Sequence, residues 1–322
     1  MNFSKYFSIN VSGHKDIDFI DIPLDTDVAL YIDPALLAAG KDPFSKSAWD
    51  AVKSFFYLLF DYCRKEDYEG INYLLTYVGE ANETHLGLSR GYPLGKGASR
   101  RILVPILSDM IKRGFFSDGL VLEPHDLLVF ATNFSEDRMS DVIFNIIRDL
   151  ACMFTIEQCV KHRVNLESEL KYIKPHWSTN QKRWVFREWP VPYDHNLKPI
   201  VLLPKTIVRR SYAYGVNFYL QHFVLEYRQR VHLVNKSKLC REGKNGKGII
   251  ELRPPYKKDI RHEEMVGYSV KDYVAEVTIE YPLLIGGFRN EVNNLDRKEE
   301  LAMSNSELNT IAYNSPAQPY GA

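Results

Sequence analysis

Residues 136–162, EDRMSDVIFNIIRDLACMFTIEQCVKH, decide the fold of this chain. Apolar side chains recur in this stretch every three or four positions, which is the spacing of a helix with a wide buried face. They are Met139, Val142, Ile143, Ile146, Ile147 and Leu150. Ser135 stands directly before the run and is a suitable N-cap. The sequence therefore predicts a long helix that lies largely within the core.

Further elements are predicted on both sides of this helix. Apolar residues at helical spacing predict helices over 47–65 and 216–234, and two more between 262 and 301. Short apolar runs bounded by turn residues predict strands. These runs lie within 16–33 and at 72–78 and 200–208, and a further short apolar run at 127–131 is assigned to neither helix nor strand. We therefore expect an α+β (mixed α/β) fold, with a central mixed sheet flanked by helices and a more helical, basic C-terminal part.

The chain of 322 residues is long enough for one large domain or two of medium size. We expect an α/β domain that carries the candidate site over 1–171, followed by an irregular connection rich in Trp and Pro over 172–199. A strand and a helical basic region follow over 200–302, and residues 303–322 are expected to form a tail.

The net charge is zero, but the charge is unevenly distributed. Residues 198–261 hold 15 Lys and Arg against 4 Asp and Glu, a net charge of +11, so contact with a polyanion is expected in this part. No apolar run approaches the roughly 18 residues of a membrane helix. The four cysteines form no CxxC pair, which argues against a zinc site and against a disulfide framework. We therefore expect a cytoplasmic protein without membrane contact.

Polar residues follow one line of the long helix, which makes its first turns a candidate site. Asp137, Asp141, Asn145 and Arg148 recur every three or four residues. Two carboxylates one turn apart can share a divalent cation, and oxygen ligands of this kind suit Mg²⁺ or Mn²⁺. Two further candidate ligands are Asp27 and Asp33, which flank an apolar strand. The alternative is structural: Asp137 stabilises the helix start, and Asp141 pairs with a neighbouring arginine.

A glycine-rich segment over 82–101, NETHLGLSRGYPLGKGASRR, is a second candidate. Glycines let the backbone approach a ligand, and the start of the following helix presents N–H groups to an anion. The candidate phosphate contacts are Gly95, Lys96, Gly97, Arg100 and Arg101. Glu83, at the start of the segment, could complete a metal site with Asp137 and Asp141. The spacing does not match a P-loop, so an ordinary surface loop is the alternative.

Cationic residues of the C-terminal half are candidates for contacts with substrate. Lys205 ends an apolar run and would stabilise the charge of a transition state, although Leu203 stands where metal-dependent nucleases place a carboxylate before such a lysine. Arg209, Arg210 and Lys244 are expected to contact nucleic acid, with tyrosines nearby that could stack on bases. The basic stretch 236–248 is predicted to be a loop.

Four segments together resemble a group of uncharacterised prokaryotic proteins associated with phage-defence gene neighbourhoods. They are VALYIDPALL (28–37), NETHLGLSRGYPLGKG (82–97), EDRMSDVIFNIIRD (136–149) and IVLLPK (200–205). The similarity depends mainly on Asp137-Arg138, Ser140-Asp141 and Asn145. It implies no particular reaction, but it implies a setting of bacterial self-defence.

The first hypothesis is a metal-dependent phosphodiesterase or nuclease that acts on nucleic acid, as an antiviral defence effector. Its catalytic residues would be Asp137, Asp141, Glu83 and Lys205, with Mg²⁺ or Mn²⁺ on the three carboxylates, and Asn145 would contact the substrate. The alternative is a non-catalytic sensor or adaptor that binds nucleic acid or a partner effector protein encoded in the same operon. An enzyme that acts on a small nucleotide through the glycine-rich segment is a third possibility.

Overall fold

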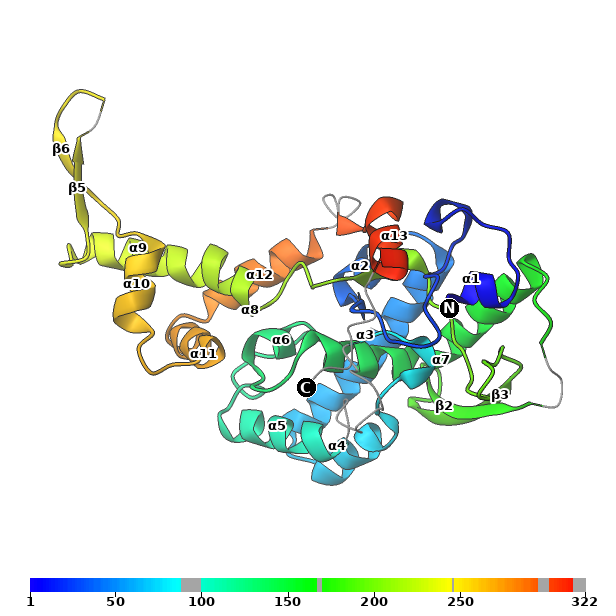
Figure 1. Cartoon of the computed structure of the whole chain (residues 1–322). Coiled ribbons are helices and arrows are strands. Elements are labelled where there is room, and N and C mark those ends of the chain that lie inside the picture. Colours follow the sequence, from blue (N-terminus) through cyan, green and yellow to red (C-terminus); the bar gives the residue numbers. More distant parts are fainter. Residues whose placement is uncertain (88–99, 167–169, 245, 295–300, 315–322) are drawn as a thin grey trace, which may run out of the picture.

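The structure is a computed structural model that describes residues 1–87, 100–166, 170–244, 246–294 and 301–314. A body made by residues up to 215 and by the last helix carries a helical arm made by residues 216–293 (Figure 1). The α+β class is confirmed. Within the described ranges, however, the strands form three separate two-stranded antiparallel sheets and no single central sheet. None of the helices in these ranges has the length and apolar character needed to cross a membrane.

Two long helices, α3 (Pro43–Arg64) and α7 (Glu136–Lys161), pack against each other inside the body. The predicted long helix is confirmed as α7, and Ser135 caps it by accepting a hydrogen bond from the Arg138 backbone N–H at 3.4 Å. Asp42 caps α3 in the same way through the Ser45 N–H at 2.9 Å. Both helices bury aromatic and aliphatic side chains, and these form the centre of the core.

The remaining helices of the body are short. They are α1 (Phe3–Tyr6), α2 (Pro34–Ala39), α4 (Tyr68–Leu74), α5 (Arg100–Lys112) and α6 (Asp126–Phe130), with 3₁₀ turns η1 (His14–Asp16), η2 (Leu75–Tyr77), η3 (Asn82–Thr84) and η4 (Lys205–Ile207). The strand predicted at 72–78 is wrong, because α4 and η2 occupy this position. The apolar run at 127–131 lies mostly in α6. All five residues of α6 are buried, so the run shows no period that could distinguish a helix from a strand.

Two small sheets complete the body. β1 (Tyr31–Ile32) pairs with β4 (Val208–Arg209), so only the end of the apolar run 200–208 joins a ladder. β2 (Tyr172–Ser178) pairs with β3 (Arg183–Trp189) over seven residue pairs. The expectation of an irregular segment over 172–199 is therefore wrong for most of its length, since its tryptophans belong to a regular hairpin that packs on α7.

The arm begins with a nearly continuous helix. α8 (Val216–Tyr219) runs through a π-helical turn (Leu220–Val224) into α9 (Leu225–Val234), which confirms the predicted helix over 216–234. The other arm helices are α10 (Lys257–Glu264), α11 (Val270–Glu280) and α12 (Leu283–Asn293). The stretch 236–248 was predicted to be a loop, but its residues Arg241–Lys244 form β5, which pairs with β6 (Ile250–Arg253).

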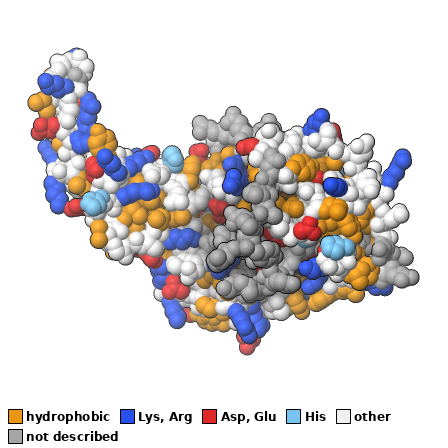
Figure 2. All heavy atoms as spheres, in the orientation of Figure 1, with side chains coloured by type: hydrophobic (Ala, Val, Ile, Leu, Met, Phe, Trp, Pro, Cys, Tyr) orange, Lys and Arg blue, Asp and Glu red, His pale blue; other side chains and the backbone are white. Residues whose placement is uncertain are grey.

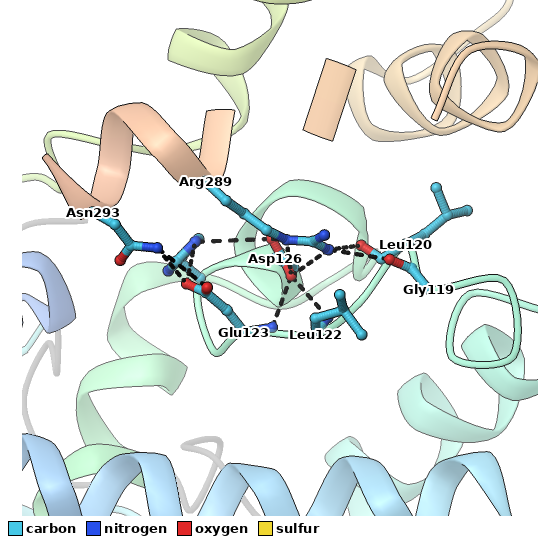
Figure 3. A network of polar contacts seen from close by, with 8 residues as sticks. Gly119, Leu120, Leu122, Glu123, Asp126, Arg289 and Asn293 are labelled. Carbon is cyan, nitrogen blue, oxygen red and sulfur yellow. Dashed lines mark hydrogen bonds and ion pairs between the residues drawn. The ribbon is translucent and has the colours of Figure 1, made fainter. Parts of the chain in front are cut away.

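A buried ion pair joins the arm to the body (Figure 3). Arg289 of α12 donates to Asp126 at 2.8 Å and to the Leu120 carbonyl at 2.8 Å, and the Asp126 side chain is fully buried. The same carboxylate accepts the backbone N–H groups of Leu122 and Glu123 at 2.9 and 2.8 Å. Because the Asp126 carboxylate is fully buried and Arg289 supplies its opposite charge, this ion pair fixes α12 of the arm on α6.

A lysine of α11 makes a second buried contact. The Lys271 ammonium donates to the carbonyls of Ala131 and Phe134 at 2.7 and 2.8 Å. Burial lowers the pKa of Lys271 to about 8. These carbonyls lie directly before α7, so the arm contacts the segment that leads into the candidate site.

The last helix, α13 (Asn305–Asn314), returns to the N-terminal segment of the body (Figure 1). Asn309 Oδ1 accepts the His14 backbone N–H at 3.0 Å, and the Tyr313 hydroxyl donates to Asp21 at 2.8 Å. The described part of the expected tail is therefore a docked helix, and residues 315–322 lie outside the described ranges.

Candidate functional site

The first turn of α7 lies against the entrance of the glycine-rich segment. Gly87 has a φ of +119°, and a Cβ at this position would lie 2.8 Å from Asp137 Oδ1. The Gly87 N–H donates to the Val28 carbonyl at 2.9 Å, which holds the backbone in this place. Only glycine permits both the conformation and the close approach. The Asp137 carboxylate therefore lies at the point where residues 88–99 begin.

One turn further along α7, Asp141 contacts the segment that precedes the glycines. Its Oδ1 accepts the Ala81 N–H at 3.2 Å. Asn145 follows and donates to the Gly79 carbonyl and to the Asp141 carbonyl, both at 2.7 Å. The polar line on α7 and the segment around residues 79–84 thus lie side by side.

Glu83 of η3 also contacts this polar line, but further from the start of α7. Its Oε1 is 3.4 Å from Arg148 Nε, and it accepts a hydrogen bond from the Tyr172 hydroxyl. Arg148 is 4% exposed and also donates to the Pro175 carbonyl and to Asn145 Oδ1, both at 2.5 Å. Burial, with the Glu83 charge next, raises the pKa of Tyr172 far above its ordinary value, so the phenol keeps its proton and donates.

This network separates Glu83 from Asp137. Arg148 is eleven residues beyond Asp137, which corresponds to about 16 Å along the helix axis. Glu83 is therefore the ion-pair partner of Arg148 and does not join Asp137. Among the described residues, no group of three or more His, Cys, Asp and Glu is arranged to hold a metal ion. The pair Asp137 and Asp141 is what α7 offers to a cation, and Mg²⁺ commonly uses one or two carboxylates together with phosphate oxygens.

Two tyrosines from other elements, Tyr31 and Tyr212, lie near the start of α7 together with Glu136, the first residue of that helix. Burial, reinforced by the charges of Asp137 and Glu136, raises the pKa of Tyr31 to about 12. Glu136 accepts the Tyr212 backbone N–H at 3.0 Å, and the Tyr212 hydroxyl donates to the Ile32 carbonyl at 2.7 Å. Glu136 could have been found because it directly precedes Asp137. No local pattern indicates Tyr212, which lies 76 residues after Glu136.

Asp33, one of the further candidate ligands, is buried beside this group. It caps α2 by accepting the Ala35 N–H at 2.8 Å, and Arg209 Nε lies 4.0 Å away. Burial raises the pKa of Asp33 to about 6 in spite of these contacts. Asp27, the other candidate, lies 3.8 Å from His85 Nδ1.

Lys205 does not reach this region. Its ammonium donates to the His14 carbonyl, and its backbone N–H donates to the Asp18 carbonyl at 3.0 Å. The Asp18 carboxylate in turn pairs with Lys161, the last residue of α7, at 2.6 Å. Residue 161 is about 30 Å along the helix from Asp141. The structure therefore does not bring Lys205 together with the two aspartates.

The predicted phosphate and nucleic-acid contacts are dispersed. Arg100 and Arg101 are exposed at the start of α5, and Gly95, Lys96 and Gly97 lie outside the described residues. Arg209 donates to the Ser211 carbonyl at 3.2 Å, and together with Arg210 it lines a pocket of about 240 Å³ against α13. Lys244 lies at the end of β5, far out on the arm (Figure 1).

The chain belongs to the family described as Domain of unknown function (DUF8370), which matches residues 8–215. The match ends one residue before α8, so it covers the body up to the arm and includes α7 with its polar line. No curated protein and no solved structure matches the chain.

Proposed function

We propose that this protein binds nucleic acid and hydrolyses its phosphodiester bonds, with a Mg²⁺ or Mn²⁺ ion held by Asp137 and Asp141. The observation that supports the proposal is the contact between the Asp137 carboxylate and Gly87, at the entrance of a segment rich in glycine. Asp141 follows one turn later on the same side of α7. A divalent ion there would polarise a phosphoryl oxygen and lower the pKa of a bound water.

The residues of the chain would divide the work of the reaction. Asp137 and Asp141 supply negatively charged oxygens, and the missing side chain of Gly87 lets the backbone lie directly against the Asp137 carboxylate. Tyr31 keeps its proton at neutral pH and can donate a hydrogen bond to a phosphate oxygen. Water adds to phosphorus, the bond to the leaving oxygen breaks, and a proton passes to that oxygen. Glu83 and Lys205 have no part in this step, because they lie elsewhere.

The test is cleavage of plasmid, single-stranded DNA and tRNA with Mg²⁺ or Mn²⁺, and with EDTA in place of the metal. We expect Asp137→Asn and Asp141→Asn to lower the cleavage rate by at least about 100-fold, which corresponds to the several kcal/mol that a metal contributes. Asparagine keeps an oxygen that can accept the Ala81 N–H, so the fold is retained. Asp50→Asn, an exposed change on α3, is the matched control.

Absence of cleavage under every condition would refute the proposal. Cleavage at an unchanged rate in both asparagine variants of α7 would assign the activity to another part of the chain or to a contaminant.

A second function is favoured by a specific observation: Glu83, Asn145 and Arg148 are all engaged in buried contacts that hold β2 and the segment before Gly87. On this reading the polar line is structural, and the protein is a sensor or adaptor that binds nucleic acid or an effector protein of the same operon. Binding that persists in EDTA without any turnover would select this function.

The resemblance to proteins of phage-defence gene neighbourhoods implies that the substrate would be foreign nucleic acid. Plaque counts on bacteria that express the protein, with Asp141→Asn as the comparison, test this setting separately from the chemistry.

A further inference from the structure

The hairpin of β5 and β6 projects from the end of the arm as a ribbon of two strands (Figure 1). None of its described strand residues is buried, and all four residues of β6 are exposed. No third strand pairs with it within the described ranges. Isolated two-stranded ribbons are marginally stable in water, so a ribbon of this kind needs an anchor at its base.

The base of the ribbon is anchored by Arg241. Its guanidinium lies 3.6 Å from the centre of the Tyr256 ring, and its Nε donates to the Pro254 carbonyl at 3.0 Å. Gln229 of α9 donates to the Pro255 carbonyl at 2.7 Å. The ribbon thus extends from a fixed point on an arm that Arg289 fixes to the body (Figure 3).

The ribbon and its flanks are strongly basic. Residues 236–258 hold 8 Lys and Arg against 2 Glu, a net charge of +6, and blue side chains run along the projection in Figure 2. Arg241 and Arg253 lie directly opposite each other in the ladder, and Arg253 extends over Gly243 to donate to the Lys244 carbonyl at 2.6 Å, so cations occupy one face of the ribbon along its length. Within the described part of the chain, no carboxylate lies within 4 Å of Arg241, Lys244 or Arg253. These cations are available to pair with an external polyanion.

Apolar side chains accompany these cations. Ile250 and Leu252 are 64% and 42% exposed, and they lie on the same face of β6 because they are two residues apart. A surface that combines cations with exposed aliphatic groups fits a ligand in which phosphates flank a groove lined by partly apolar groups.

We propose that the β5–β6 hairpin enters the major groove of duplex DNA. The groove is about 12 Å wide and admits a two-stranded ribbon, whereas the corresponding groove of duplex RNA is too narrow for side chains to read. Lys244 of β5 and Lys258, which is exposed in the first turn of α10 beside the base of the hairpin, contact the phosphates. Ile250 and Leu252 contact base edges such as the thymine methyl group. The inference shares with the proposed function the class of ligand, but it requires no catalysis.

The test is the fluorescence anisotropy of a labelled 20-base-pair DNA duplex with the full chain, in EDTA, over a range of KCl concentrations. Single-stranded DNA of the same sequence and duplex RNA are the comparison ligands. We expect Lys244→Gln/Lys258→Gln to weaken duplex binding by about 10-fold or more, and to reduce the slope of log K against log salt by about 2. Lys46→Gln/Lys53→Gln, two cations of α3, changes the charge equally and is expected to leave both quantities unchanged.

Each outcome decides one statement. Hairpin-dependent duplex binding in EDTA, together with no cleavage of any substrate in the separate assay with Mg²⁺ or Mn²⁺, supports this inference and removes the proposed nuclease. Equal weakening by the α3 control, tighter binding to single strands or to duplex RNA, or no DNA binding at low salt overturns the inference. Cleavage that persists at full rate in the hairpin variant leaves the nuclease in place and removes the hairpin from substrate binding.

Discussion

The two long hairpins of this protein have the same topology and opposite surroundings. In β2–β3, Trp177, Trp184 and Trp189 are buried, and the hairpin packs on α7 and α3. In β5–β6, no strand residue is buried. The first hairpin is stabilised by the core that it helps to form. The second contributes almost nothing to a core, so packing inside the described part of the chain does not determine which residues it carries.

The largest test of this difference removes a buried ring. Trp189 is 1% exposed, and its Nε1 donates to Asp149 of α7 at 3.2 Å. We expect Trp189→Ala to lower the free energy of unfolding by about 3–5 kcal/mol, as for other buried aromatic residues. Ile250→Ala on the exposed hairpin should stay within about 0.5 kcal/mol. Urea denaturation measures both, and similar losses in the two variants would break the comparison.

The buried Asp33 in the body predicts that the free energy of unfolding depends on pH. The pKa of Asp33 is raised to about 6 in the folded protein, above 3.8 for the unfolded chain, so folding favours the protonated carboxyl. Its stabilising contribution is present below pH 3.8 and is lost as the pH rises through 6. We expect this loss to be about 2–3 kcal/mol.

Asp33→Asn keeps the cap on α2 and removes the titration. The free energies of unfolding of the two proteins, measured by urea denaturation from pH 4 to 7, should therefore diverge in favour of the variant as the pH rises. Parallel curves would show that Asp33 does not titrate in this range.

The smallest effect concerns the contact between β2 and the polar network. Tyr172→Phe removes the hydroxyl that donates to Glu83 but leaves the ion pair of Glu83 with Arg148. We expect a loss of about 1–2 kcal/mol in the free energy of unfolding. Tyr57→Phe, at a side chain that is 69% exposed on α3, is the control and should cost almost nothing. A null result for Tyr172 would mean that the network does not stabilise β2.

Periodic segments could be predicted because their pattern is local. The apolar spacing in α3 and α7 and the cap at Ser135 are set by nearby residues alone. The start of α3 was predicted four residues too late, because Asp42 caps a helix that begins at Pro43. The polar line on α7 could be predicted for the same reason. Its approach to residues 79–84 was expected because a strand was predicted to end there, but the structure has the 3₁₀ turns η2 and η3 in this part of the chain.

Other features depend on contacts between distant residues, and no local pattern carries them. The tryptophans of 172–199 have no period, because the buried positions of β2 and β3 do not alternate regularly. Glu83 was expected beside Asp137, but it pairs with the buried Arg148. The sequence placed Arg148 on the polar line without indicating its partner. Lys205 was assigned from its place at the end of an apolar run, while its partner His14 lies 191 residues earlier.

The return of α13 to the first residues has a consequence for biosynthesis. The hydrogen bond between His14 and Asn309 spans 295 positions, and Tyr313 reaches Asp21 across a similar interval. On the ribosome, the N-terminal segment emerges long before the helix that covers it has been translated. The surface around η1 that α13 covers therefore stays exposed until translation has passed residue 313.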